Sequence, residues 1–306
     1  MRVDVDRIGD GPIIFPHMDR RMGDNINGPS LIKVPDWISE PLGKYYLYFA
    51  HHDGQYIRLA YADSVIGPWR THEPGVMPIE RSRFRGHIAS PDVHVDHRAR
   101  QIRMYFHGAD LPTGEGGSQS TRLALSKDGI FFDEQSEVLG QAYMRVVQLG
   151  SWYYGLAMPG VIYRSRDGLT NFEVGSTLFA PDTRHSALLL WGDRLFVFYT
   201  RVGDVPEHIR MSEIRLSPDW LGWRAERSVA VLMPEKKFEG ACLPLRPSVR
   251  GLARDPMHEL RDPAIFSGER ETYLLYSVAG EKGIAIAHLS LSDSMDSNVA
   301  QGMASC

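Results

Sequence analysis

The feature that most constrains the fold is a short β-type phrase that occurs five times along the chain. Each copy is an aromatic-rich segment followed by a turn and then by a segment in which apolar and polar residues alternate. The copies cover residues 46–61, 102–126, 152–165, 195–212 and 273–288. Repeats of a few tens of residues are typical of solenoids, propellers or arrays, because each unit buries its apolar face against its neighbours. Five all-β units predict a five-bladed β-propeller of four-stranded antiparallel blades around a central channel.

One more apolar segment precedes each copy and supplies the innermost strand of each predicted blade. These segments are residues 28–34, 89–95, 143–147, 185–190 and 262–266. Short polar turns rich in glycine and aspartate follow them, which is typical of hairpins. Because the innermost strands of a propeller line its channel, the residues at their beginnings should meet around the axis. We therefore expect one pocket, formed by residues 24–27, 90–92, 143–145, 184–185 and 261–262.

The remaining sequence divides into an insertion and a tail. A single propeller domain is predicted over residues 1–292, with an insertion at about 217–260 that is rich in proline. Long ordered connectors are often functional, and we expect this one to cover part of the channel mouth. Residues 293–306 are rich in serine, aspartate and asparagine without periodicity, so a disordered C-terminal tail is predicted.

Charge and composition exclude several classes of partner. The chain has 34 lysines and arginines against 38 aspartates and glutamates, a net charge of −4, so no nucleic-acid partner is expected. No apolar run approaches the roughly 20 residues of a membrane helix, and residues 1–15 do not resemble a signal peptide. With only Cys242 and Cys306 present, no disulfide framework is expected. These observations predict a cytoplasmic protein without a membrane partner.

Several motifs resemble a known group of enzymes. Residues 45–52 and 57–69 resemble the first blade of the five-bladed glycoside hydrolases, the arabinanase, levansucrase and invertase superfamily, and most of all family 43. The Ser-Pro-Asp-Val of residues 90–93 is similar to the Ala-Pro-Asp-Val of their second blade. The Arg-Asp-Pro of residues 261–263 is similar to a motif of the invertase-like and mannoside-phosphorylase-like branches. The resemblance covers residues 20–290 and implies a glycosidase that binds an oligosaccharide or glycoside.

Glycoside hydrolysis needs two carboxyl groups, one that protonates the leaving oxygen and one that activates water or attacks carbon. The resemblance implies that Asp24 is the base and that Asp92 and Asp262 orient and tune the other groups. The family's third-blade Asp-Pro phrase and fourth-blade Glu-Gly-Pro phrase are absent, so the acid stays open between Glu239, in the insertion, and His185. A histidine can serve as an acid because its pKa lies near neutrality.

The substrate is expected to contact five residues around the channel mouth. They are Asn27, Tyr143, Arg145, Arg184 and Arg261. Three arginines beside few carboxylates would suit an acidic, sulfated or phosphorylated sugar.

The resemblance also bears on cofactors and on alternative functions. No cofactor is required for this chemistry, but relatives often hold one structural cation on the axis, so a calcium ion there is a further expectation. Two alternatives stay open. The missing carboxylates favour a carbohydrate-binding propeller without catalysis, and the arginines would serve a glycoside phosphorylase.

Overall fold

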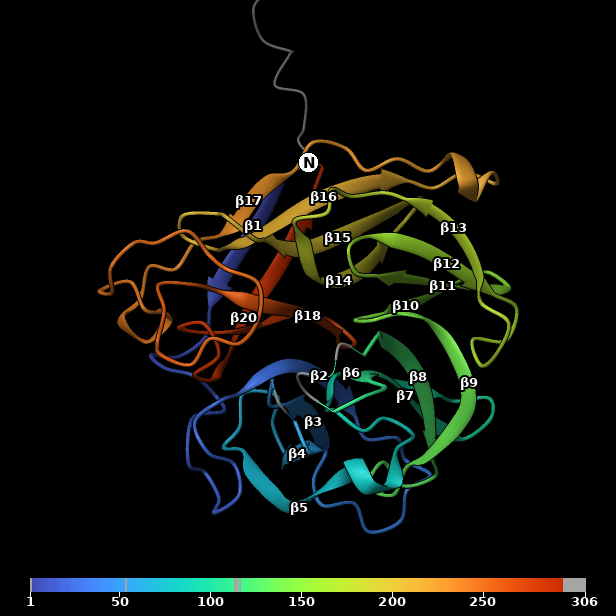
Figure 1. Ribbon diagram of the computed structural model, residues 1–306, viewed down its shortest axis with the longest axis horizontal. Helices are drawn as coiled ribbons and strands as arrows, with labels where there is room; N and C mark the ends of the chain where they lie inside the picture. Colours follow the sequence, from blue (N-terminus) through green and yellow to red (C-terminus); the bar gives the residue numbers. More distant parts are fainter. Residues whose placement is uncertain (1, 53, 113–114, 116, 294–306) are drawn as a thin grey trace, which may run out of the picture.

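Five four-stranded antiparallel sheets are arranged radially around a common axis in the computed structural model (Figure 1), which confirms the predicted five-bladed propeller. The structure describes residues 2–52, 54–112, 115 and 117–293. Blade one consists of β2 (Asn27–Lys33), β3 (Tyr45–Ala50), β4 (Tyr56–Ala62) and β5 (Arg70–Pro78). Blade two consists of β6 (Ile88–Asp96), β7 (Gln101–Ala109), β8 (Gln119–Ser126) and β9 (Asp133–Gln141).

The remaining blades repeat this order. Blade three contains β10 (Arg145–Leu149), β11 (Trp152–Ala157), β12 (Val161–Ser165) and β13 (Glu173–Thr177). Blade four contains β14 (Thr183–Trp191), β15 (Arg194–Arg201), β16 (Ile209–Arg215) and β17 (Val229–Leu232). Blade five contains β18 (Arg261–Ser267), β19 (Thr272–Ser277) and β20 (Ile284–Ser292), with β1 (Arg2–Arg7) as its outer strand. Short 3₁₀ turns occur at η1 (Ile79–Arg81), η2 (Trp220–Gly222) and η3 (Lys237–Glu239).

The outer strand of blade five comes from the N-terminus, where the sequence analysis assigned no strand. β1 pairs antiparallel with β20, from Arg2 opposite Ser292 to Arg7 opposite Ala287. The first and last strands of the chain therefore share one sheet. Because this pairing completes the fifth blade with the other end of the chain, it closes the ring.

The aromatic strands are apolar on both faces because each is packed between two neighbouring blades. In β3, Tyr46 and Tyr48 pack against blade two, whereas Leu47 and Phe49 pack against blade five. Successive side chains of a strand point to opposite faces, so a strand buried on both sides reads as a continuous apolar run. Five buried clusters of this kind occur, one at each interface between blades. The repeated aromatic phrase is thus a consequence of inter-blade packing.

A local distortion recurs where each innermost strand enters the channel. One residue per blade has a left-handed backbone: Gly28 (φ 60°), Ser90 (φ 46°), Tyr143 (φ 60°), His185 (φ 50°) and Asp262 (φ 47°). We call these five residues the axial ring. In blades one, two, four and five, the pairing with the second strand is irregular at this residue. Left-handed non-glycine residues cost of order 1–3 kcal/mol and cluster at functional sites, so the axial ring marks the place to look for chemistry.

Blade one has glycine in the axial ring because blade two lies too close for a side chain. A Cβ atom at Gly28 would lie 2.9 Å from Cα of Ser90. The innermost strands of the first two blades therefore meet at this point without a side chain between them. This position carries no chemical group of its own.

Residues 233–260, within the predicted insertion, return from the outer strand of blade four to the axis. The carbonyl of Val249 accepts a hydrogen bond from Arg184, and that of Gly251 accepts one from Arg261. The C-terminal tail was predicted to be disordered. From residue 294 onward it lies outside the described residues. Within the described residues we find no helical segment with the length and apolar character that crossing a bilayer requires.

Candidate functional site

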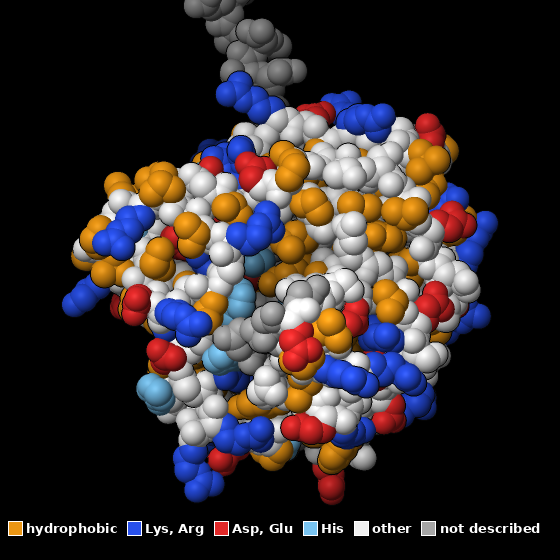
Figure 2. Space-filling view, viewed as in Figure 1, with side chains coloured by type: hydrophobic (Ala, Val, Ile, Leu, Met, Phe, Trp, Pro, Cys, Tyr) orange, Lys and Arg blue, Asp and Glu red, His pale blue; other side chains and the backbone are white. Residues whose placement is uncertain are grey.

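Three members of the axial ring lie next to one another and carry functional groups. Nδ1 of His185 is 3.3 Å from Oδ1 of Asp262. The ring of Tyr143 lies 5.3 Å from that of His185, between centroids, and stacks on His107 at 3.8 Å. Figure 2 shows histidine side chains grouped near the centre of the face viewed along the axis. The structure thus brings His185, Asp262 and Tyr143 together from three different blades.

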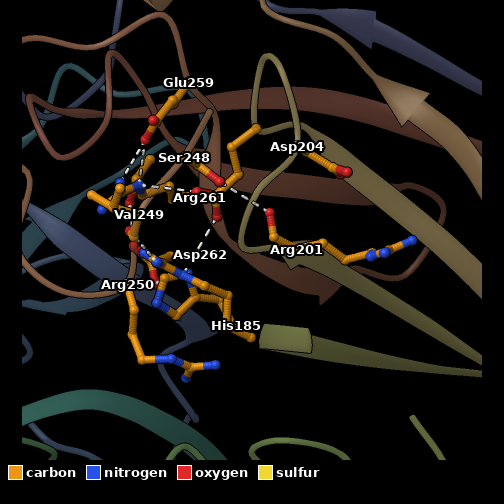
Figure 3. Close-up of polar contacts among 12 residues, drawn as sticks. His185, Arg201, Asp204, Ser248, Val249, Arg250, Glu259, Arg261 and Asp262 are labelled. Atoms are coloured by element: carbon orange, nitrogen blue, oxygen red, sulfur yellow. Dashed lines mark hydrogen bonds and ion pairs between the residues drawn. The ribbon is translucent and has the colours of Figure 1, made fainter. Parts of the chain in front are cut away.

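The arginines that precede His185 and Asp262 are buried and bound to glutamates. Nε of Arg261 donates to Oε2 of Glu259 at 2.8 Å, and its Nη1 donates to Oε1 of Glu281 at 3.1 Å. Glu207 lies between the two arginines, with Oε2 3.5 Å from Nε of Arg261 and Oε1 3.4 Å from Nε of Arg184. Figure 3 shows part of this group beside residues of the insertion. We call the seven residues Arg184, His185, Glu207, Glu259, Arg261, Asp262 and Glu281 the axial cluster.

The three glutamates were missed by the sequence analysis because they lie outside the repeated strands. Glu207 and Glu281 occupy the connections β15–β16 and β19–β20, and Glu259 ends the insertion. No motif surrounds them, but their positions within the predicted blades indicate that they lie near the channel mouth. In an antiparallel blade, the connection between the second and third strands opens on the same face as the start of the first strand. Acidic residues in those connections were therefore candidates for the channel mouth.

The expectation of three arginines beside few carboxylates is wrong. Arg261 contacts three glutamates, and Arg184 contacts Glu207. Arg145 donates from Nε to the carbonyl of Ser186 and from Nη1 to that of Pro91, so it holds backbone of blades four and two. These guanidinium groups are engaged within the protein, and the physical basis for an acidic substrate is removed.

The surroundings of His185 keep its imidazole neutral and favour the protonated form of Asp262. Nε of Arg184 donates to Nδ1 of His185 at 3.2 Å, so this nitrogen is an acceptor and carries no proton. Oδ1 of Asp262 lies 3.3 Å from the same nitrogen, and because the lone pair of that nitrogen already accepts from Arg184, the contact does not stabilise an ionised carboxylate. Burial and the nearby arginines lower the pKa of His185 well below its usual value, so the imidazole stays neutral. Burial, followed by the charge of Glu281, raises the pKa of Asp262 to about 6.

Glu281 is held in the opposite protonation state. Burial alone would raise its pKa, but hydrogen bonds from His52 and Asn25 and the charge of Arg261 lower it to about 2. Nδ2 of Asn25 donates to Oε2 at 2.6 Å, and Nδ1 of His52 is 3.2 Å from Oε1. The site therefore contains one carboxyl group that titrates just below neutrality and one that is ionised throughout the neutral range. Such pairs are the usual sign of acid and base assignments.

Asp24, the predicted base, lies at the rim and outside the axial cluster. Its side chain is 65% exposed, and Oδ2 is 2.9 Å from Nζ of Lys282. The hydrogen bond from Lys282 lowers the pKa of Asp24. The side chain precedes β2 and turns to solvent, while Asn25 and Asn27 turn inward and are buried.

Glu239, one of the two predicted acids, lies between blades four and five. It contacts Arg7 of β1, the outer strand of blade five, and is not part of the axial cluster. Its carboxylate is fully buried, with Oε1 accepting from Nε of Arg7 at 2.8 Å and from the hydroxyl of Tyr276 at 2.9 Å. Oε2 accepts from Nη2 of Arg7 and from the backbone N–H groups of Glu235 and Lys236. We call Arg7, Glu239 and Tyr276 the closure cluster, because Arg7 belongs to the strand that closes the ring. The opposing effect of burial is outweighed by these donors, and the pKa of Glu239 is lowered, so it is not placed or protonated as an acid.

Asp92 lies one level deeper in the channel than the axial ring. Its Oδ2 accepts from the backbone N–H of Val146 and lies 2.8 Å from Nε2 of His94. Burial would raise the pKa of Asp92, but His94 and Arg145 lower it. A narrow cavity of about 80 Å³ at this level is lined by Ser30, Asp92, Arg145, Ala187 and Ala264, among others. Asp92 thus ties blade two to blade three beneath the site.

The predicted calcium ion stays a prediction. Among residues 2–52, 54–112, 115 and 117–293, no three histidine, cysteine, aspartate or glutamate side chains form a group that could hold a metal ion.

Comparison with known proteins supports the fold and identifies a relative. No family model matches the chain. Solved structures with the same fold include an α-L-arabinofuranosidase from Lactobacillus brevis (TM-score 0.59, 12% identity, 87% of this chain and 91% of that chain). They also include a GH43_1 enzyme from Xanthomonas citri complexed with xylose (0.60, 12%, 91% and 91%). A third is an N-acetylgalactosamine deacetylase from F. plautii in complex with blood group B trisaccharide (0.60, 10%, 94% and 95%).

At these identities the likeness concerns the fold, which hosts more than one activity. The resemblance to the five-bladed propellers of glycoside hydrolase family 43 therefore holds at the level of structure. A sequence relative is also found: uncharacterized protein R118 of Acanthamoeba polyphaga mimivirus is 36% identical over 299 residues, which cover 87% of this chain and 83% of that protein. This chain therefore belongs to the same protein family as R118, with the five-bladed fold of the family-43 glycoside hydrolases.

Proposed function

We propose that this protein is a glycosidase that cleaves a short oligosaccharide or glycoside at the axial cluster. The observation that carries the proposal is the pair of nearby buried carboxyl groups with opposite pKa shifts, Asp262 to about 6 and Glu281 to about 2. The fold adds support, because solved proteins that share it include glycoside hydrolases. Two carboxyl groups in different protonation states are what glycosidic bond cleavage requires.

Asp262 is the proton donor in this proposal. Its carboxyl proton passes to the glycosidic oxygen as the bond from that oxygen to the anomeric carbon breaks. A water molecule adds its hydroxyl group to that carbon, and the proton that the water loses restores the carboxyl group of Asp262. The hydrogen bond from the hydroxyl of Ser277 and the contact with His185 fix the orientation of the carboxyl group. General acid catalysis of this kind contributes roughly 10²–10⁴-fold to a rate.

Glu281 stabilises the charge that develops during cleavage. The transition state resembles an oxocarbenium ion, so positive charge accumulates at the anomeric carbon. An ionised carboxylate in a buried site lowers the energy of that charge far more than it would in water. Asn25, His52 and Arg261 hold Glu281 in place, so the site is organised before substrate binds.

The test is turnover of a panel of nitrophenyl glycosides and short oligosaccharides by the wild type and by Asp262→Asn. We expect hydrolysis of at least one substrate and a loss of about 100-fold or more in Asp262→Asn, with an unchanged circular dichroism spectrum. The matched control is Glu269→Gln, which alters an exposed carboxylate paired with Lys33 and should leave turnover unchanged. Full activity of Asp262→Asn, or no hydrolysis across the panel, would overturn the proposal.

A second candidate is a carbohydrate-binding propeller without catalysis. It is favoured by blade one, which contributes Gly28 to the axial ring instead of a carboxylate, and by the exposed position of Asp24. Sugar binding without turnover would support this candidate. A glycoside phosphorylase would require inorganic phosphate for turnover, but the arginines on which that alternative depended are engaged with glutamates or with backbone carbonyls.

A further inference from the structure

The axial cluster carries more negative than positive charge. Its cations are Arg184 and Arg261, and its carboxyl groups are Glu207, Glu259, Glu281 and Asp262. Three glutamates against two arginines leave one net negative charge when Asp262 is protonated and two when it is ionised. The two buried histidines, His107 and His185, do not offset this charge, because burial lowers the pKa of each well below its usual value.

Cations near the cluster face carboxylates, bond backbone carbonyls or lie in solvent. The buried Arg58 donates to the carbonyls of Asn25 and Met22. Arg145 lies 3.8 Å from Oδ1 of Asp92, and Lys282 is paired with Asp24. Arg250 lies at the mouth, where it is exposed and donates to the carbonyl of Pro181. Water and salt screen an exposed charge of this kind, whereas charges inside the cluster are screened much less. The excess negative charge therefore acts on whatever enters the axis.

The buried polar atoms around the cluster supply a second observation. Within the described residues, atoms without a hydrogen-bond partner include both carboxylate oxygens of Glu207, Oε1 of Glu259, Oδ1 of Asn27, both ring nitrogens of His107 and Nη2 of Arg184. A neutral imidazole has one donor and one acceptor, so acceptors outnumber donors in this group. Buried polar groups in folded proteins normally have partners. The unmatched acceptors point to a ligand that brings donors.

We propose that the axial site takes a sugar with a protonated amino group, such as a hexosamine glycoside. This inference rests on the proposed function, which supplies the premise that the ligand is a carbohydrate. An ammonium group supplies three hydrogen-bond donors, no acceptor and one positive charge, which matches both observations. Since no three described side chains form a metal-binding group, an organic cation fits the site better than a metal ion. The expected substrate charge is therefore positive, whereas the arginines alone suggested a negatively charged, acidic sugar.

The experiment measures binding, so that it does not depend on turnover. Titration calorimetry near pH 7 compares methyl glycosides of glucosamine, galactosamine and mannosamine with their N-acetylated, neutral and hexuronic acid counterparts. For at least one of the three configurations we expect the amine to bind about tenfold more tightly than its N-acetylated form. The hexuronide should bind most weakly, and the preference should shrink as salt is added.

A variant sharpens the assignment to the cluster. Glu281→Gln removes one negative charge and should reduce the preference for the amine severalfold, whereas Glu269→Gln, which alters an exposed carboxylate, should not change it. If Glu281→Gln does not fold, Glu259→Gln, which removes a carboxylate from the same cluster, takes its place. Equal binding of amine and N-acetylated sugars, tighter binding of hexuronides, or no binding at all would overturn the inference.

The outcomes separate this inference from the proposed function. Binding of amino sugars without cleavage of any glycoside would support the inference and overturn the glycosidase. Cleavage of neutral glycosides with no preference for amines would support the glycosidase and overturn the inference.

Discussion

The closure cluster and the axial cluster are both buried and both combine arginine with glutamate, yet they are arranged differently. In the closure cluster, Arg7, the hydroxyl of Tyr276 and two backbone N–H groups satisfy both oxygens of Glu239. In the axial cluster, both oxygens of Glu207 have no hydrogen-bond donor, and the pKa of Asp262 is raised.

Under the proposed function, the difference separates a cluster that stabilises the fold from one that binds a ligand. A buried ion pair with every lone pair bonded stabilises the state in which it forms, and loss of one partner is costly. Unmatched acceptors, a carboxyl group that titrates near neutrality and strained backbone at His185 and Asp262 all cost stability. Proteins retain such features where binding or catalysis uses them.

The largest effect is expected from breaking the closure cluster with Glu239→Gln. The change leaves the mostly buried guanidinium of Arg7 with only the exposed carboxylate of Glu235 as an ionic partner, which should cost about 3 kcal/mol of unfolding free energy. Urea unfolding at pH 7 measures this loss. The double variant Arg7→Met with Glu239→Gln should recover part of the lost stability. As a control, Asp4→Asn breaks the exposed pair with Arg2 on the same strand and should cost less than about 0.5 kcal/mol. A cost near zero for Glu239→Gln would remove the contrast between the clusters.

Asp262→Asn should have the opposite effect on stability. The raised pKa means that the folded protein disfavours the ionised carboxyl group, so a neutral side chain should stabilise the fold at pH 7 by about 1–2 kcal/mol. The same urea experiment checks the sign, while turnover should fall as described above. Destabilisation comparable to that of Glu239→Gln would mean that the axial cluster is also structural.

The two axial carboxyl groups should give opposite dependences of stability on pH. Asp262 has a folded pKa of about 6, above the unfolded value of roughly 4, so its contribution falls as pH rises across that interval. Glu281 has a folded pKa of about 2, below the unfolded value of roughly 4.3, so its contribution is lost as pH falls across that interval. Thermal unfolding from pH 2 to pH 8 measures both slopes, and Asp262→Asn should abolish only the upper one. Turnover should decline as pH rises above about 6, because the donor loses its proton.

The smallest effect is expected from Asp24→Asn at the rim. An exposed carboxylate paired with a lysine contributes little, so stability should change by less than about 0.5 kcal/mol and turnover by less than about twofold. Unfolding curves and steady-state kinetics of this variant check both values. A tenfold loss of turnover would return the role of base to Asp24 and contradict the site described above.

The architecture and part of the site follow from local patterns in the sequence. The fivefold aromatic phrase predicts the blades because every strand buried between two blades must be apolar on both faces, and that requirement is local to each repeat. The position at which each innermost strand begins is also set by the neighbouring sequence. Residues such as His185 and Asp262 could therefore be assigned to the channel from the sequence. The left-handed backbone that they share was not visible, because neither residue type requires it.

Which charges meet depends on contacts that form only in the folded molecule. Glu239 and Asp24 occupied plausible positions along the chain, but the partners that fix their states, Arg7 and Lys282, lie 232 and 258 residues away in sequence. Glu281 has no motif and became part of the site through Asn25, 256 residues away. The protonation states of Asp262 and Glu281 follow from burial and from those distant partners. A pKa depends on what surrounds a group in three dimensions, and the order of residues along the chain does not specify those surroundings directly.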